Sequence, residues 1–85
     1  MLNSDFVHEQ AEKLAARLRA EAPDPAAQVR HGLEIATQRP ASDADVAAGL
    51  QFLGDMEKQA GDSPEKALDR FSLLLVNLNE FMYLD

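Results

Sequence analysis

The chain has 85 residues, of which 8 are Lys or Arg and 15 are Asp or Glu, so its formal net charge is −7. This length corresponds to one small domain, and we expect a single domain over residues 1–85. An apolar content of 46%, with only four Gly and four Pro, excludes a disordered, collagen-like or low-complexity chain. Because the sequence has no Cys, disulfides, thiolate metal sites, cysteine nucleophiles and covalent haem attachment are excluded.

The distribution of charged and apolar residues argues against several partner classes. Nucleic-acid binding usually needs a basic patch, and the Arg residues are scattered through an acidic chain, so we expect no nucleic-acid partner. Apolar runs such as residues 73–76 are far shorter than the roughly 20 residues that cross a bilayer, so we expect a soluble protein without membrane insertion. Asp5 and Glu9 near the start are unlike a signal peptide, and the residues do not indicate a compartment.

Residues 5–22 are predicted to form the first helix. Ser4 is a candidate N-cap, and apolar residues recur at helical spacing at Val7, Ala11, Leu14 and Leu18. The helix ends at residues 22–25 because Pro cannot continue the hydrogen-bond ladder. Asp24 and Pro25 are a cap followed by a proline in the first helical position, which predicts a second helix over residues 25–38.

Pro40 ends the second helix, and Ser42 with Asp45 predicts the capped start of a third helix over residues 43–59. The inward positions of this third helix are Val46, Leu50, Leu53 and Met56. Gly49 and Gly54 lie inside it, and each destabilises a helix by up to about 1 kcal/mol relative to Ala. Ser63 and Pro64 repeat the cap and proline, which predicts a fourth helix over residues 64–82.

These elements define the expected fold class. No segment alternates strictly between apolar and polar residues, so strands are not expected. Short loops between four amphipathic helices are typical of helical bundles. We therefore expect an all-α fold, a compact bundle of four helices that are mainly antiparallel, with no sheet.

The fourth helix is apolar on two sides. A helical wheel places one wide stripe inward, formed by Ala67, Phe71, Leu74, Leu75, Leu78, Phe81 and Met82. The opposite side carries a second apolar set, formed by Leu73, Val76, Tyr83 and Leu84. Two interpretations stay open: the other three helices wrap this helix, or the second set is an exposed interface for another chain, a second copy, or another part of a longer protein.

Residues that could carry chemistry have simpler structural explanations. His8 and Glu12 resemble part of a zinc-binding H-E-x-x-H motif, but Glu12 replaces the second His and no third ligand is identifiable. His31 lies opposite the apolar face of its helix, which indicates a surface position. Serines and paired carboxylates fall mainly at helix starts, where capping and the helix dipole explain them. We therefore expect no catalytic, metal or cofactor residues and no enzymatic activity.

Two strings carry a family resemblance: residues 2–11, LNSDFVHEQA, and residues 74–85, LLVNLNEFMYLD. Together they resemble the C-terminal segment of the planctomycete-type cytochrome-c-associated multidomain proteins of unknown function. That family shows an F-V-x-E-Q-A string, an L-G-R-x-P turn and a closing N-E-F-x-Y motif. The segment 36–40, ATQRP, keeps the Arg and the Pro of the turn and lacks its Gly. The resemblance covers nearly the whole chain and implies one module of a longer exported protein, or a short relative of it, with no haem and no catalytic residue in this segment.

The leading functional expectation is a non-enzymatic helical interaction or structural module. It would dock another chain or an upstream domain through its last helix, at Leu73, Val76, Tyr83 and Leu84. The alternative is an accessory C-terminal domain that supports a redox or hydrolytic site located elsewhere in a longer exported protein. A third hypothesis, a small metal-assisted enzyme, depends only on the His8 and Glu12 pair.

Overall fold

The computed structural model describes residues 4–83, and the side chains of residues 4–78. It contains the helices α1 (Ser4–Glu21), α2 (Pro25–Thr37), α3 (Asp43–Gln59) and α4 (Pro64–Tyr83), and no strand lies within these residues. Each predicted helix end is within one residue of the observed end. The all-α fold with four helices is confirmed.

The helix starts follow from local hydrogen bonds that the sequence predicted. The Asp24 side chain accepts a 2.9 Å hydrogen bond from the backbone N–H of Ala27, directly before the proline that opens α2. Ser42 and Asp45 form a reciprocal capping box at the start of α3, with bonds of 3.0 and 3.3 Å. The Ser63 hydroxyl accepts from the backbone N–H of Lys66 at 3.1 Å. These caps satisfy donors that a helix start would otherwise leave unpaired.

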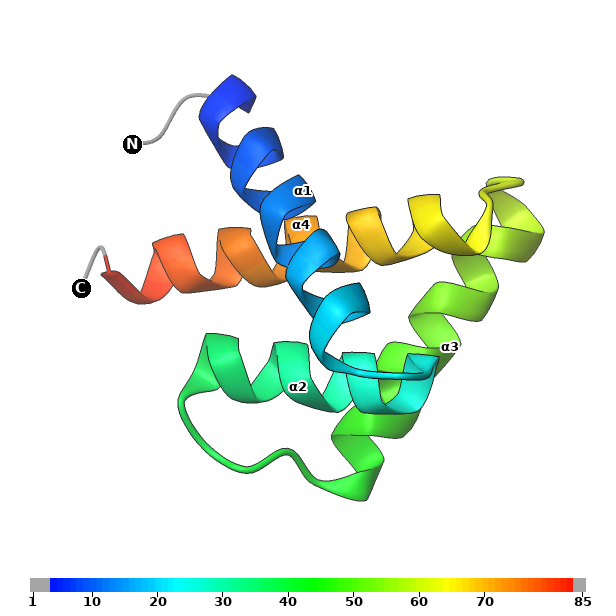
Figure 1. The fold of residues 1–85 in the computed structure, drawn as a ribbon, viewed down its shortest axis with the longest axis horizontal. Helices are drawn as coiled ribbons and strands as arrows, with labels where there is room; N and C mark the ends of the chain where they lie inside the picture. The colour runs from blue at the N-terminus through cyan, green and yellow to red at the C-terminus, as the bar shows by residue number, and fades with distance from the viewer. Residues whose placement is uncertain (1–3, 84–85) are drawn as a thin grey trace.

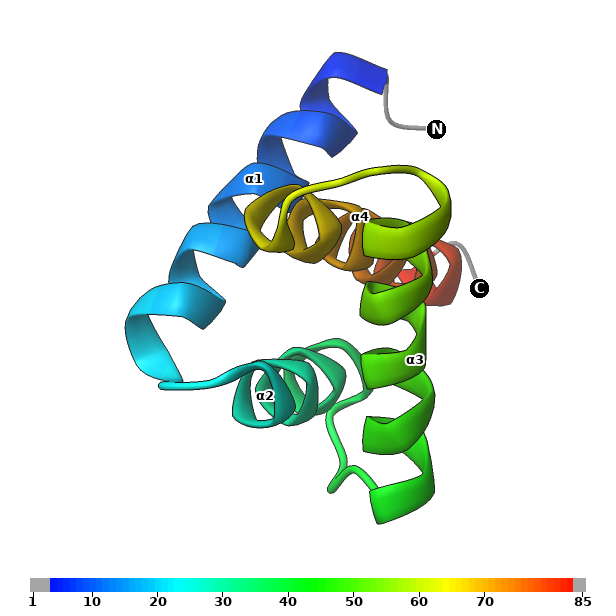
Figure 2. The ribbon, with the colours of Figure 1, turned by 90° about the vertical axis from the view of Figure 1, so that its right-hand side faces the viewer.

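The helices are arranged in layers (Figure 1). In the turned view, α1 lies on one face, α2 and α4 form the middle, and α3 lies on the other face (Figure 2). Helices α2 and α4 each contact the other three helices, whereas α1 and α3 share no contact among the described residues. The most extensive contact is between α1 and α4. Helix α4 therefore lies between two helices that do not touch each other.

Helix directions are mixed within this bundle. Helices α1 and α3, which do not contact each other among the described residues, run in opposite directions on the two faces of the middle layer (Figure 2). Helices α2 and α4 run in the same direction, from right to left in Figure 1. The physical reason is that the loop after α2 and the length of α3 carry the chain back across the molecule, so α4 starts at the same end as α2.

The core lies between the four helices, and α1 contributes the fully buried Ala15 and Leu18 to it. The rings of Phe52 and Phe71 are 6.3 Å apart, and two helical glycines allow close packing around them. A Cβ added at Gly49 would lie 2.4 Å from Cγ1 of Val29, and one at Gly32 would lie 2.8 Å from Cδ1 of Leu75. Glycine weakens an isolated helix, yet α3 continues through Gly49. Because Gly49 has no side chain, α2 can pack closely against α3 at this position, and that packing stabilises the helix.

Candidate functional site

The C-terminal half of α4 carries an exposed apolar surface. Leu74 is 50% exposed and Leu78 is 44% exposed, and the two residues lie one helical turn apart. Every described buried residue of α4 lies at or before Leu75, and from Val76 to Leu78 no side chain is buried. We refer to Leu74 and Leu78 as the outer strip of α4.

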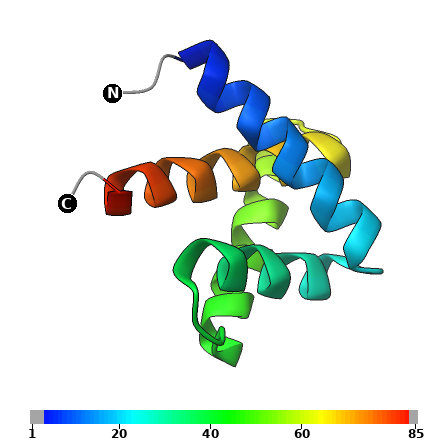
Figure 3. The same cartoon turned by 60° about the vertical axis from the view of Figure 1, so that its left-hand side comes forward.

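The helical wheel was wrong for both residues of the outer strip, which it placed inward. Phe71 and Leu75, from the same predicted stripe, are buried as expected. The difference arises because the C-terminal half of α4 extends beyond α3 (Figures 1 and 3), whereas the helical wheel assumes that the stripe is covered along its whole length. The side chains of Phe81 and Met82, also predicted to face inward, lie outside the described side chains.

The predicted interface residues have mixed positions. Leu73 and Val76 are half-buried, and Leu73 lies beside residues of α1 in a surface cleft. The side chain of Tyr83, and Leu84 as a whole, lie outside the described residues. The interpretation that α4 is wrapped by the other three helices therefore fits its first half, whereas the outer strip in its second half is exposed.

The outer strip lies in an uncharged stretch of sequence. No residue between Arg70 and Glu80 carries a formal charge, in a chain with 8 basic and 15 acidic residues. Arg70 itself pairs with Asp62 at 2.5 Å. A surface that is apolar and uncharged is better suited to contact with another apolar surface than to binding an ion or a polar small molecule.

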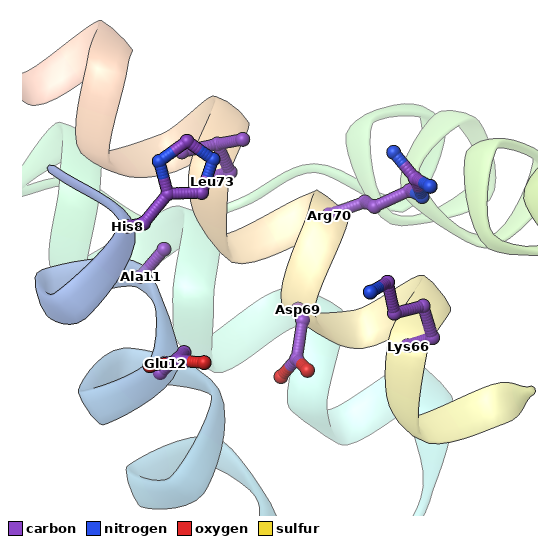
Figure 4. Close-up of a pocket in the computed structure, with 7 residues that line it drawn as sticks. All are labelled: His8, Ala11, Glu12, Lys66, Asp69, Arg70 and Leu73. Carbon is purple, nitrogen blue, oxygen red and sulfur yellow. The ribbon is translucent and has the colours of Figure 1, made fainter. Parts of the chain in front are cut away.

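A cleft of about 170 Å³ lies between α1 and α4 (Figure 4). Its lining residues are His8, Ala11, Glu12, Lys66, Asp69, Arg70 and Leu73. The ring Nδ1 of His8 donates to the carbonyl oxygen of Ser4 at 2.8 Å, and Asp69 pairs with Arg19 at 3.5 Å. No group of three or more His, Asp or Glu side chains within the described residues could hold a metal ion. The cleft thus combines charges of both signs, and two of them, on Asp69 and Arg70, already have partners.

Among the serines, Ser72 is the one whose environment the sequence did not indicate. It is fully buried in α4, and its hydroxyl has no hydrogen-bond partner within the described chain. A nucleophilic serine needs a base within hydrogen-bond reach. Ser42 and Ser63 have the capping roles that were predicted. Capping therefore explains Ser42 and Ser63, whereas the Ser72 hydroxyl is buried without a base or any other hydrogen-bond partner within the described chain.

One titratable cluster joins α1 to α2. The ring Nε2 of His31 donates to Oε1 of Glu21 at 2.6 Å, and Nε of Arg17 donates to the same carboxylate at 3.0 Å. These hydrogen bonds, first from His31 and then from Arg17, lower the pKa of Glu21 below its usual value of 4.5. His31 is half-buried rather than fully on the surface, because it packs beside the end of α1.

No helix within the described residues has both the length and the apolar character needed to cross a membrane. Comparisons with protein-family models, with curated proteins and with solved structures found no match to this chain. The resemblance of its two end strings to the cytochrome-c-associated proteins stays a prediction.

Proposed function

We propose that this chain is a non-enzymatic helical interaction module that docks a protein partner through the C-terminal half of α4. The observation that carries this proposal is the exposure of Leu74 and Leu78 on adjacent turns of one helix. Burying a whole Leu side chain contributes about 1.5–3 kcal/mol, so covering the exposed half of each contributes on the order of 1 kcal/mol. The two residues together supply the apolar centre that a docking surface needs.

The polar groups of the chain support a structural role over a catalytic one. The side chains of Asp24, Ser42, Asp45 and Ser63 cap helices, and Glu34 accepts from the backbone N–H of Ala41 at 3.1 Å. These groups stabilise helix starts and loops. The predicted contact residues Leu73, Val76, Tyr83 and Leu84 lie on the opposite side of α4 on the helical wheel, so docking through them stays a separate prediction, and the proposed surface is centred on Leu74 and Leu78.

Site-specific photocrosslinking tests the proposal. A benzophenone amino acid replaces Leu74 or Leu78 in the protein expressed in its native cells, and the matched control replaces Ala47, which is exposed on α3. We expect a discrete crosslinked product, identified by mass spectrometry, from positions 74 and 78 and not from position 47. Equal or absent crosslinking at all three positions contradicts docking through α4.

A further inference from the structure

We propose that the partner docked by the outer strip is a second copy of this chain; this inference rests on the proposed function. The strip is exposed in a single protomer, and a twofold-symmetric contact needs only one self-complementary patch. Leu74 and Leu78 have the four-residue spacing of neighbouring positions on a helix surface. When two such helices pair in antiparallel order, Leu74 of each copy faces Leu78 of the other.

The charge distribution favours this occupant. Each protomer carries a formal charge of −7, so two copies repel each other over most of their surfaces. The nine residues from Phe71 to Asn79 carry no charge, which makes this part of α4 a place where two copies can meet without opposing like charges. A basic partner would be favoured by acidic side chains beside the strip, and the sequence between Arg70 and Glu80 contains none.

Twofold symmetry sets the orientation of the pair. A twofold axis that crosses the two α4 helices at right angles relates them in antiparallel order. The charged residues in the first half of α4, Glu65, Lys66, Asp69 and Arg70, sum to zero net charge and therefore do not oppose this order.

The core is rich in alanine, so dimer formation would add apolar burial that stabilises the folded chain. Among the residues whose side chains are described, six of the fourteen buried apolar residues are Ala, namely Ala11, Ala15, Ala22, Ala36, Ala41 and Ala67. Alanine contributes little apolar area, and a domain of this length buries a smaller fraction of its surface than a larger one. Small domains with limited cores commonly gain stability by oligomerisation, which shifts the folding equilibrium by mass action.

Sedimentation velocity and light scattering over a concentration series test the oligomeric state. We expect the wild-type mass to rise toward twice 9.3 kDa with concentration. The double variant Leu74→Glu/Leu78→Glu should have a dimer dissociation constant at least about tenfold higher. The control Ala47→Glu/Gln51→Glu adds the same two charges at exposed positions, one turn apart on α3, and should dimerise like wild type when both chains are compared at matched ionic strength.

The salt dependence separates a second copy from a basic partner. Because like-charged protomers repel, raising NaCl from about 20 mM to about 300 mM should strengthen the dimer. Association that weakens over this range contradicts the charge argument. A wild-type chain that stays monomeric at every concentration and salt level overturns the inference, while a photocrosslink from position 74 or 78 to a different protein would leave the proposed function intact.

Cysteine pairing tests the antiparallel order, since the native chain has no Cys. Leu74→Cys and Leu78→Cys are oxidised separately and as a mixture. An antiparallel pair predicts that mixed disulfides between positions 74 and 78 dominate. Dominant disulfides between two identical positions would overturn this arrangement.

Discussion

Ser72 shows how a single polar atom can work against the stability of a small core. Its hydroxyl is enclosed in α4 and makes no hydrogen bond within the described chain. Burying an unpaired hydroxyl costs roughly 1–3 kcal/mol, because the hydrogen bonds to water are lost and not replaced. The native state is therefore less stable than it would be with an apolar side chain of similar size at position 72.

Replacing this serine should therefore not weaken the fold. We expect Ser72→Ala to leave the free energy of unfolding unchanged or to raise it by about 1 kcal/mol, measured by urea denaturation. Ser63→Ala is the matched control, because it removes a hydroxyl that caps α4 and should lower the free energy of unfolding by about 1 kcal/mol. A loss of stability in Ser72→Ala equal to that in the control would show that the hydroxyl has a partner.

The burial of Ser72 could not be predicted from the sequence. On the helical wheel it lies at the edge of the apolar stripe, next to Leu68, which is also buried. A wheel gives the direction of each side chain but not the width of the neighbouring helices. Because α1 packs most extensively on α4, the covered arc is wider on that side than the apolar residues alone indicate.

At the scale of the helices, two glycines of α3 have opposite roles. Gly49 lies against Val29 of α2, at a distance that leaves no room for a Cβ. Gly54 has no atom within 4 Å of its Cβ direction. The same residue type is thus needed for packing at one position and only weakens the helix at the other.

The two alanine substitutions should change stability in opposite directions. Gly49→Ala is expected to lower the free energy of unfolding by about 1–3 kcal/mol, because it forces α2 and α3 apart. Gly54→Ala is expected to raise it by up to about 1 kcal/mol, because Ala favours the helix and restricts the unfolded chain. Thermal and urea denaturation of both variants measure this difference. Stabilisation by both substitutions would show that the contact at Gly49 adapts easily.

Helix boundaries were predictable because their signals are local. The cap residues Asp24, Ser42 and Ser63 act on N–H groups only three positions away, so the sequence contains both partners of each bond. The outer strip was not predictable in the same way. The exposure of Leu74 and Leu78 depends on where α3 ends relative to α4, which is set by tertiary packing and not by any nearby residue.

At the scale of the whole molecule, the Glu21 cluster makes stability depend on pH. The pKa of Glu21 is lower in the folded chain than its usual value of 4.5, because His31 and Arg17 donate hydrogen bonds to the carboxylate. A group whose pKa is lowered by folding stabilises the native state above its unfolded pKa. That contribution is lost as the pH falls through the folded pKa.

Removing this carboxylate should flatten the acid side of the stability profile. Between about pH 5 and about pH 3, the free energy of unfolding of wild type should fall more steeply than that of Glu21→Gln. Glu57→Gln is the control, since Glu57 is exposed on α3 and has no hydrogen bond or ion pair within the described chain. Urea denaturation at a series of pH values gives the slopes, and parallel profiles for wild type and Glu21→Gln would contradict the proposed coupling of α1 to α2.

The separation of α1 from α3 affects how a binding event would spread through the protein. Since these outer helices never touch within the described residues, a disturbance in one reaches the other only through the middle layer. Helix α4 belongs to that layer and also carries the outer strip. A molecule bound to the strip therefore contacts a helix that itself touches each of the other three. Through α4, a partner bound at the strip would therefore hold the helix pair, α2 and α4, that connects the two outer helices.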